Sequence, residues 1–377
     1  MIYFDNSATT KTRKEVLDTF YKVSEEFFAN PNSLHKLGLK SKKLMREAES
    51  QVATLMGVKS DEVIFTSSSS ESNNMAIKGV IDYYKYRNKL VITTELEHAS
   101  ISETLQQLGE DISVKYVKLD KFGHIDLDNL NALLQEEPVL VTIHHVNSET
   151  GIIQDIEEIG KLIKKYPKTI FHVDGTQSVG KIPVNLDNVD LFSFSAHKFF
   201  GIKGIACLIK KENINLLPLI SGGDSQTIYR AGTPSVPLIA SLAKALRLIL
   251  EEEDENTLKV VELNKYLRNQ LTNLDVVINS PKDSSPYILN FSIIGKKPET
   301  VLHTFELFDI YISSKTACSS KEDYSKTLYA LTNNMDISKS SLRVSLSKDN
   351  TKEEIDTFIK VLKEEIQKIE PVFKARN

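Results

Sequence analysis

The stretches 169-TIFHVDGTQ-177 and 190-DLFSFSAHK-198 decide the fold of this chain. Each is a short apolar run that ends in residues able to do chemistry: Asp174 after the first run, and His197 and Lys198 after the second. Such runs alternate with amphipathic segments, which predicts βαβ units and a largely parallel sheet with helices on both faces. The other expected strands are 62–66, 89–94, 114–119, 139–146 and 204–210, and the expected helices lie near 34–56, 72–86, 99–108, 127–135 and 155–165.

Asp174 and Lys198 are expected to share one site, because ligands of parallel sheets bind beyond the carboxyl ends of the strands. A lysine shielded from water can act as a Schiff-base nucleophile. A buried carboxylate needs a partner, and a Schiff-base lysine with an acidic partner for a pyridinium nitrogen is typical of pyridoxal phosphate (PLP) sites. Taken singly, Lys198 also fits a solvated surface lysine, and Asp174 fits a residue that caps the following turn.

Composition places the chain among ordinary globular proteins. Its 47 Lys and Arg against 51 Asp and Glu give a formal net charge of −4, which argues against direct binding to nucleic acid or to an anionic membrane. No window holds the ~18 uncharged apolar residues that a membrane helix needs, and no secretory signal pattern opens the sequence. The two cysteines, Cys207 and Cys318, exclude a disulfide scaffold and a four-cysteine metal site within one chain. These features predict a cytoplasmic protein.

The length of 377 residues predicts two domains. A helix expected near 235–253 ends in the acidic run 251–255, which indicates a solvated helix end or a linker and suits a domain boundary near 250–260. Near the other end of the chain, Thr351 stands three residues before Glu354, the spacing of a capping box. An amphipathic helix that packs on a core is expected after it.

Two further stretches follow predicted strands. The hydroxyl-rich run 66-TSSSSESNN-74 precedes a helix, whose N-terminus attracts phosphate, although an ordinary serine-capped loop explains the run equally well. His98 follows another strand and could stack on a flat cofactor, move protons or be merely structural. His144 and His145 are neighbours on a strand and point to opposite faces, so no metal site is expected there.

The C-terminal third holds the remaining candidates. Cys318 lies in the polar loop 313-SSKTACSSK-321, where flanking lysines favour a reactive thiolate, whereas Cys207 sits in an apolar strand and fits a buried small side chain. Arg343 could hold a substrate carboxylate with its guanidinium fork, and 229-YRAGTP-234 is a turn-rich segment. Taken alone, Arg343 and the turn-rich segment also fit an ordinary surface.

Together these pieces resemble the PLP-dependent cysteine desulfurases of the aminotransferase class V family, and the resemblance runs nearly end to end. It includes 3-YFDNSATT-10, 30-NPNSLH-35, 174-DGTQ-177, 195-SAHK-198 and 317-ACSS-320, in the family's order. The resemblance implies PLP fold type I: a large domain, 12–255, with a mainly parallel seven-stranded sheet, and a smaller α+β domain formed by 1–11 and 256–377 that carries the cysteine loop. The Ala-Cys-Ser-Ser form is similar to the group with the longer, flexible loop, which must carry sulfur from the cleft to an acceptor.

The resemblance also implies a role for each candidate. Lys198 would hold PLP and move protons, His98 would stack on the ring and act as an acid–base group, and Cys318 would attack the sulfur of L-cysteine and become a persulfide while alanine leaves. The cofactor-binding set would be Lys198, Asp174, Gln177, His98, Ser69, Ser70, Ser195, His197, Ser148 and Thr233, the last from the second subunit of a homodimer. The substrate-binding set would be Arg343, Asn6 and Ser148.

Three departures from the family pattern matter. Ser68-Ser69-Ser70 replaces Gly-Ala-Thr, so position 68 loses the positive φ open to glycine. Asn147-Ser148-Glu149 replaces Asn-Asn-Glu, and the shorter Ser148 could weaken turnover. Lys315 stands where the family often has Gly-Ser before Ala-Cys.

Three functions therefore stay open at this point. The first is a cysteine desulfurase that passes sulfur to an acceptor protein, either an iron–sulfur scaffold or a tRNA-thiolation enzyme. The second is a related class V enzyme, a selenocysteine lyase or an aminotransferase, in which Cys318 is incidental. The third is a weakly active paralogue that works as a binding subunit.

Overall fold

The computed structural model describes residues 1–314, 323–365 and 368–370, so Cys318 lies outside the described residues. All seven predicted strands are present and form one sheet in the order β2-β8-β7-β6-β5-β3-β4, in which only β8 runs antiparallel to its neighbours. The predicted mainly parallel seven-stranded sheet is confirmed. The strands are β2 (Val63–Thr66), β3 (Leu90–Thr93), β4 (Ser113–Tyr116), β5 (Leu140–His144), β6 (Ile170–Asp174), β7 (Leu191–Ser195) and β8 (Ala206–Lys210).

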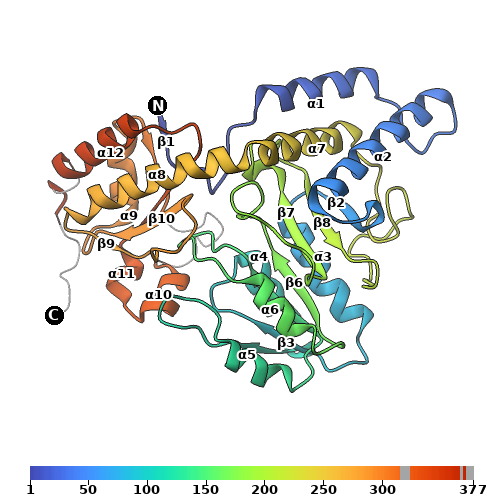
Figure 1. The fold of residues 1–377 in the computed structure, drawn as a ribbon, viewed down its shortest axis with the longest axis horizontal. Helices are drawn as coiled ribbons and strands as arrows, with labels where there is room; N and C mark the ends of the chain where they lie inside the picture. Colours follow the sequence, from blue (N-terminus) through green and yellow to red (C-terminus); the bar gives the residue numbers. More distant parts are fainter. Residues whose placement is uncertain (315–322, 366–367, 371–377) are drawn as a thin grey trace.

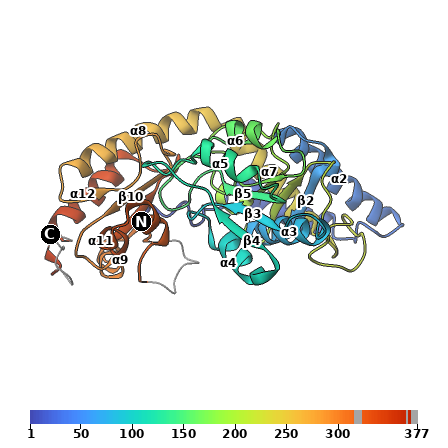
Figure 2. The ribbon, with the colours of Figure 1, turned by 90° about the horizontal axis from the view of Figure 1, so that it is seen from below.

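Helices cover both faces of this sheet because its strands alternate apolar side chains between two cores. On β6, for example, Phe171 and Val173 enter one core and Ile170 enters the other. Figure 2 shows the two helical layers on either side of the strands. The first core is covered by α1 (Lys14–Glu26), α2 (Lys36–Met56), α5 (Leu127–Leu134), α6 (Ile156–Ile163) and α7 (Val236–Glu251), and the second by α3 (Ser69–Tyr83) and α4 (Ala99–Leu108).

A third apolar core gathers the C-terminal part of the chain together with Phe4 and Val146. Two small sheets build it, one in the order β12-β10-β9 and the other a parallel pair of β1 with β11, which ties the N-terminus to this part (Figure 1). The sequence patterns predicted α12 but few of the other elements in this part of the chain. They are β1 (Ile2–Tyr3), α8 (Glu253–Thr272), β9 (Val277–Ile278), β10 (Ile288–Ser292), α9 (Pro298–Glu306), β11 (Ile310–Tyr311), α10 (Lys326–Thr332), α11 (Met335–Lys339), β12 (Ser341–Ser345) and α12 (Lys352–Glu364).

Helix α12 begins with the predicted capping box. The hydroxyl of Thr351 accepts from the Glu354 main-chain N–H at 3.3 Å, and the Glu354 carboxylate accepts from the Thr351 N–H at 3.2 Å. The acidic run 251–255 is a helix end but not a linker, because α7 ends at Glu251 and α8 begins two residues later, where the helix dipole favours acidic side chains. Within the parts of the chain that the structure describes, no helix is long and apolar enough to cross a membrane.

Candidate active site at the carboxyl edge of the sheet

Asp174 and Lys198 come from the ends of neighbouring strands at the same edge of the sheet, as the sequence predicts. Asp174 is the last residue of β6 and pairs in register with Ser193 of β7. Strand β7 is followed at once by the 3-10 helix η3 (Ala196–Lys198), whose last residue is Lys198. The two side chains are thus delivered by adjacent strand ends.

The carboxylate of Asp174 is held on both oxygens. Asn73 Nδ2 donates to Asp174 Oδ2 at 2.9 Å, and Oδ1 accepts from the Thr176 main-chain N–H at 2.9 Å and from the Thr176 hydroxyl. Asn73 lies fully buried in the second turn of α3. Sequence reasoning quoted Asn73 only as part of the hydroxyl-rich run and gave it no role. The Ser-Asn-Asn spacing after the helix start was the available signal.

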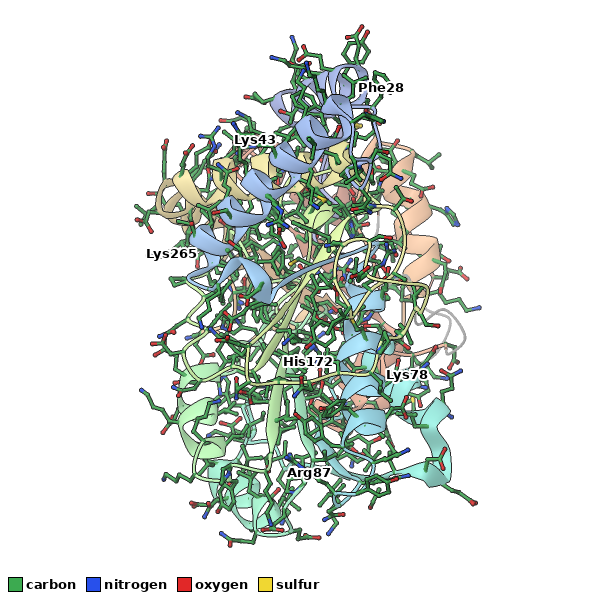
Figure 3. The ribbon with its side chains drawn as sticks, turned by 90° about the vertical axis from the view of Figure 1, so that its right-hand side faces the viewer. Phe28, Lys43, Lys78, Arg87, His172 and Lys265 are labelled. Atoms are coloured by element: carbon green, nitrogen blue, oxygen red, sulfur yellow. The ribbon has the colours of Figure 1, made fainter. Side chains whose placement is uncertain are left out.

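Behind Asp174, His172 joins three strands of the sheet, and Figure 3 places it deep inside the molecule. Its Nδ1 lies 2.8 Å from Thr142 Oγ1 on β5, and its Nε2 lies 3.0 Å from Ser193 Oγ on β7. Burial lowers the pKa of His172 to about 4, although Asp174 acts in the opposite direction. The ring is therefore neutral near pH 7 and braces the strands that carry the site.

The Lys198 amine is positioned by the N-terminal segment. Its Nζ donates to the main-chain oxygens of Ser7 at 2.7 Å and of Ala8 at 2.8 Å. Gln177 Nε2 donates to the same Ser7 oxygen at 2.8 Å, and Gln177 Oε1 accepts from Lys181 Nζ at 2.8 Å. The predicted cofactor residues Lys198 and Gln177 are therefore brought together through Ser7.

Ser69 and Ser70 open the 15-residue helix α3 at this edge. Ser68, the N-cap, accepts from the Glu71 N–H at 3.2 Å and has φ −162°, an extended conformation that any residue adopts. The backbone at position 68 therefore does not need the positive φ that glycine allows. The N-terminus of α3 remains able to attract a phosphate.

Glu71 ties the 220–233 loop to the start of α3. Arg230 Nε lies 3.0 Å from Glu71 Oε1. Burial acts against ionisation of Glu71, but hydrogen bonds from Ser67 and Arg230 outweigh it and lower the pKa of the carboxyl. Thr233, three residues further along the same loop, is exposed.

His98 caps the next helix, α4, and stands beside the same network. Its Nδ1 accepts from the Ser100 N–H at 3.1 Å and lies 2.9 Å from the Ser100 hydroxyl. Asn73 Nδ2 donates to that hydroxyl at 2.9 Å as well as to Asp174. His98 and Asp174, both members of the predicted cofactor-binding set, are thus linked through Asn73 and Ser100.

Arg343 of β12 comes from the third core to the edge of the site. Only 2% of its surface is exposed, its Nη1 donates to the Ser148 main-chain oxygen at 2.9 Å and its Nη2 contacts Asp5 Oδ1 at 2.8 Å. Its Nε is buried without an acceptor among the described residues. Such a group fits a ligand that carries an acceptor oxygen, such as a carboxylate.

Asn6 holds the neighbouring backbone. Its amide nitrogen donates to the main-chain oxygens of Ser345 at 2.9 Å and of Tyr3 at 3.2 Å. The structure therefore places the side-chain nitrogen of Asn6 on the segment that carries Arg343.

Ser195 and His197 complete the predicted set on the sheet side. Ser195 is buried at the end of β7, and His197 Nδ1 lies 3.2 Å from Thr9 Oγ1. Burial, followed by repulsion from Lys198 and Lys203, lowers the pKa of His197 to about 4. Near pH 7 its ring is neutral.

His144 and His145, for which the sequence predicts no shared metal ion, have different surroundings. His144 Nδ1 lies 2.8 Å from Glu97 Oε1, whereas His145 lines a separate cavity of about 570 Å³ with His124 and Asp283. Among residues 1–314, 323–365 and 368–370, no group of three or more His, Cys, Asp or Glu side chains is arranged to hold a metal ion.

The donor set of the site fits PLP. A fixed amine, a buried carboxylate and the start of a long helix meet at one edge, and they match the aldehyde, the ring nitrogen and the phosphate of that cofactor. The unsatisfied Nε of Arg343 adds a place for the carboxylate of an amino acid.

Comparisons with known proteins agree with this assignment. The pattern of the aminotransferase class-V family matches residues 2–358. A "NifS/IcsS protein homolog" of Lactobacillus delbrueckii subsp. bulgaricus is 41% identical over 95% of both chains. A "Cysteine desulfurase IscS" of Dictyoglomus turgidum is 37% identical over 98% of this chain and 96% of the relative. A solved structure titled "NIFS-LIKE PROTEIN" superposes with a TM-score of 0.92 at 34% identity, covering 98% of this chain and all of the other. These relatives favour the desulfurase over the lyase, aminotransferase and binding-subunit alternatives.

Proposed function

This chain belongs to the aminotransferase class V family and is a PLP-dependent cysteine desulfurase, and we propose that it stores the sulfur of L-cysteine as a persulfide on Cys318. In this step the Cys318 thiolate attacks the substrate sulfur, a new S–S bond forms and the C–S bond breaks. The electron pair of the C–S bond stays on the carbon fragment, which takes up a proton and leaves as L-alanine. When bound, PLP supplies the electron sink for charge at the substrate carbons.

The observation that carries the proposal is the convergence of Asp174, Lys198 and Arg343. Lys198, with its amine set by the carbonyls of Ser7 and Ala8, would hold the cofactor and move protons at the substrate carbons. Asp174, fixed on both oxygens, would stabilise a positive ring nitrogen. Arg343 would bind the substrate carboxylate through its unsatisfied Nε.

The remaining predicted residues would fill supporting roles. His98 would stack on the ring and exchange protons, and Gln177 would face the phenolic oxygen. Ser69, Ser70, Ser195 and His197 would hold the phosphate at the start of α3 and the end of β7. Asn6 and Ser148 would line the substrate side with Arg343, Ser148 through its backbone.

The anchors of the segment around Cys318 support its role. Ser313 and Arg343 exchange main-chain hydrogen bonds of 3.1 and 2.7 Å, so the chain enters 315–322 beside the substrate arginine. It leaves near Ser325, whose hydroxyl donates to Glu149 at 2.5 Å, next to Ser148. Cys318 is four positions after Ser314, so their Cα atoms lie at most about 14 Å apart. This limit keeps Cys318 near the arginine proposed to bind the substrate, as its proposed role requires.

A homodimer is proposed because apolar side chains are exposed both on the loop that carries Thr233 and on the neighbouring loop between α1 and α2. Leu34 is 91% exposed, Phe28 72% and Ile228 69%, and Figure 3 shows Phe28 projecting at one end of the molecule. Asn32 Nδ2 donates to the Ser225 oxygen at 3.1 Å and joins the two loops into one surface. A second copy would cover this surface and bring its own Thr233 to the phosphate site.

The acceptor is proposed to be a protein, either an iron–sulfur scaffold or a tRNA-thiolation enzyme, because a persulfide passes sulfur by attack of another thiol. A free thiolate nucleophile requires a reducing compartment, so we place the reaction in the cytoplasm. The division into 12–255 and 1–11 with 256–377 stays a prediction.

The test is release of sulfide and alanine from L-cysteine by the PLP-loaded protein with a thiol reductant. The expected result is equimolar alanine and sulfide, and loss of both in Cys318→Ala. The pH-dependent change of the visible cofactor band should persist in Cys318→Ala and be lost in Lys198→Ala. Cys207→Ala is the matched control, because Cys207 is fully buried and burial raises the pKa of its thiol. Normal turnover by Cys318→Ala would refute the assignment of the persulfide to Cys318.

A further inference from the structure

A second buried lysine, Lys181, lies beside the site and has no part in the roles above. It follows the turn that carries Asp174 and Gln177, and only 6% of its surface is exposed. Its main chain is fixed, because its N–H donates to the Ser178 oxygen at 3.0 Å and its own oxygen accepts from the Thr257 hydroxyl at 3.1 Å. Its backbone is therefore fixed, and its side chain is buried away from solvent.

Lys181 determines which way the Gln177 amide faces. An ammonium group only donates and a main-chain carbonyl only accepts, so the amide oxygen must face Lys181 Nζ, at 2.8 Å, and the amide nitrogen must face Ser7, at 2.8 Å. Lys198 donates to the same Ser7 oxygen at 2.7 Å. Three hydrogen bonds thus connect Lys181 to Lys198 through Gln177 and Ser7. The second hydrogen on Gln177 Nε2 remains for an acceptor in the site.

The charged groups that act on Lys181 are positive. Burial is the larger effect, and repulsion from Lys198 and Arg343 adds to it, so that the pKa of Lys181 falls to about 7. Lys181, Lys198, Lys348 and Tyr287 line one cavity of about 10 Å³, and burial raises the pKa of Tyr287 to about 12, so its phenol is neutral near pH 7. No carboxylate lines this cavity, among the described residues.

Repulsion between two like charges is mutual. The effect of Lys198 on Lys181 therefore implies an equal effect of Lys181 on the charged form of the nitrogen at position 198. A bound anionic cofactor would keep Lys181 protonated at neutral pH, because a negative charge nearby favours the ammonium form.

We propose that Lys181 is a positioning residue for the desulfurase reaction: it fixes the Gln177 amide with its nitrogen toward the cofactor, and its charge favours the uncharged form of the nitrogen at Lys198. The inference rests on the proposed role of Lys198 as the cofactor lysine. Three substitutions separate the two effects. Lys181→Arg keeps the charge and a donor, Lys181→Gln keeps a donor without the charge, and Lys181→Met removes both.

The readout is the pH at which the visible band of the PLP-loaded protein changes, measured together with cofactor affinity. We expect this midpoint to rise by about one pH unit in Lys181→Gln and Lys181→Met, the scale of a nearby like charge, and to stay within a few tenths in Lys181→Arg. Affinity for PLP should fall further in Lys181→Met than in Lys181→Gln, because only the methionine variant frees the Gln177 amide.

Lys210→Met is the matched control. Lys210 is also buried, donates to the main-chain oxygens of Ile214 at 2.8 Å and Lys211 at 3.2 Å, and lies at the opposite edge of the sheet because β8 is antiparallel. Its substitution should leave the midpoint unchanged. If Lys181→Met does not fold, the difference in pH midpoint between Lys181→Gln and Lys181→Arg still tests the effect of the charge.

Equal midpoints in the wild type, Lys181→Gln and Lys181→Arg would overturn the inference while leaving the proposed function intact. A band that still changes at the wild-type midpoint in Lys198→Ala would instead overturn the assignment of Lys198. The two failures are therefore distinguishable in one set of spectra.

Discussion

Replacing Asn73 by alanine tests whether the support of Asp174 governs cofactor binding. The side chain is fully buried and donates from Nδ2 both to Asp174 Oδ2 and to Ser100 Oγ, each at 2.9 Å. A hydrogen bond to a charged group contributes about 1.5–3 kcal/mol. Asp174 keeps the two Thr176 contacts on Oδ1, so Asn73→Ala should free one carboxylate oxygen rather than expel the side chain. A loss of about 1.5 kcal/mol corresponds to roughly tenfold weaker PLP binding.

The neighbouring residue provides the control for this experiment. Asn74 lies on the same turn of α3, but its amide donates only to the main-chain oxygen of Ser70, at 3.0 Å. Asn74→Ala should change PLP affinity less than twofold and leave the thermal midpoint almost unchanged. PLP affinity is measured by titration of the cofactor-free protein, followed through the visible band. If Asn73→Ala and Asn74→Ala bind PLP equally well, the reasoning that links Asn73 to Asp174 is wrong.

Three further predictions follow from the described contacts. Arg343→Lys keeps the charge but loses the planar fork, so KM for L-cysteine should rise at least about tenfold with a smaller change in kcat; an unchanged KM would contradict carboxylate binding there. His172 has a folded pKa of about 4 against an ordinary value of 6.5, so its contribution to stability is complete above pH 6.5 and is lost as pH falls toward 4. Roughly 2–3 kcal/mol should disappear over that window, and His172→Asn should flatten the thermal midpoint against pH below 6.5. Thr351→Ala should lower the thermal midpoint by about 2–4 °C through loss of the α12 cap, whereas Thr357→Ala on the same helix should not.

The large sheet could be predicted from the sequence because its strands are buried on both faces. Near-continuous apolar runs such as 169–174 and 190–195 mark such strands directly, and each run ends at a residue that the sheet then delivers to one edge. The strands of the third core were not predicted from such a pattern. Two of them, β1 and β11, are only two residues long. Ile2 of β1 pairs with Ile310 of β11, so the sequence near either strand carries no sign of the other.

The site residues also differ in whether the sequence near them indicates their role. The sequence predicts roles for Asp174, Lys198 and Gln177, which end or follow apolar runs. Ser7 and Lys181 act through contacts that no local pattern indicates, and Asn73 through a contact that only its spacing after the helix start indicates. Lys181 in particular looks like one more charged residue near a turn. Only the fold shows that its ammonium is buried against the Gln177 amide.

The departures from the family pattern show that a substitution must be judged by the backbone conformation and the main-chain contacts at its position. Ser68 lacks glycine's freedom, yet at φ −162° it does not need it and gains a hydrogen bond to the Glu71 N–H. Ser148 is the opposite case, because its contact with Arg343 uses the main-chain oxygen, which asparagine would supply equally. The substitution therefore leaves the arginine in place and changes only what the side chain at position 148 offers to the cofactor. We expect Ser148→Asn to leave KM for L-cysteine within about twofold of its original value. A rise of about tenfold, the effect of losing one hydrogen bond, would show that the Arg343 contact depends on the serine side chain.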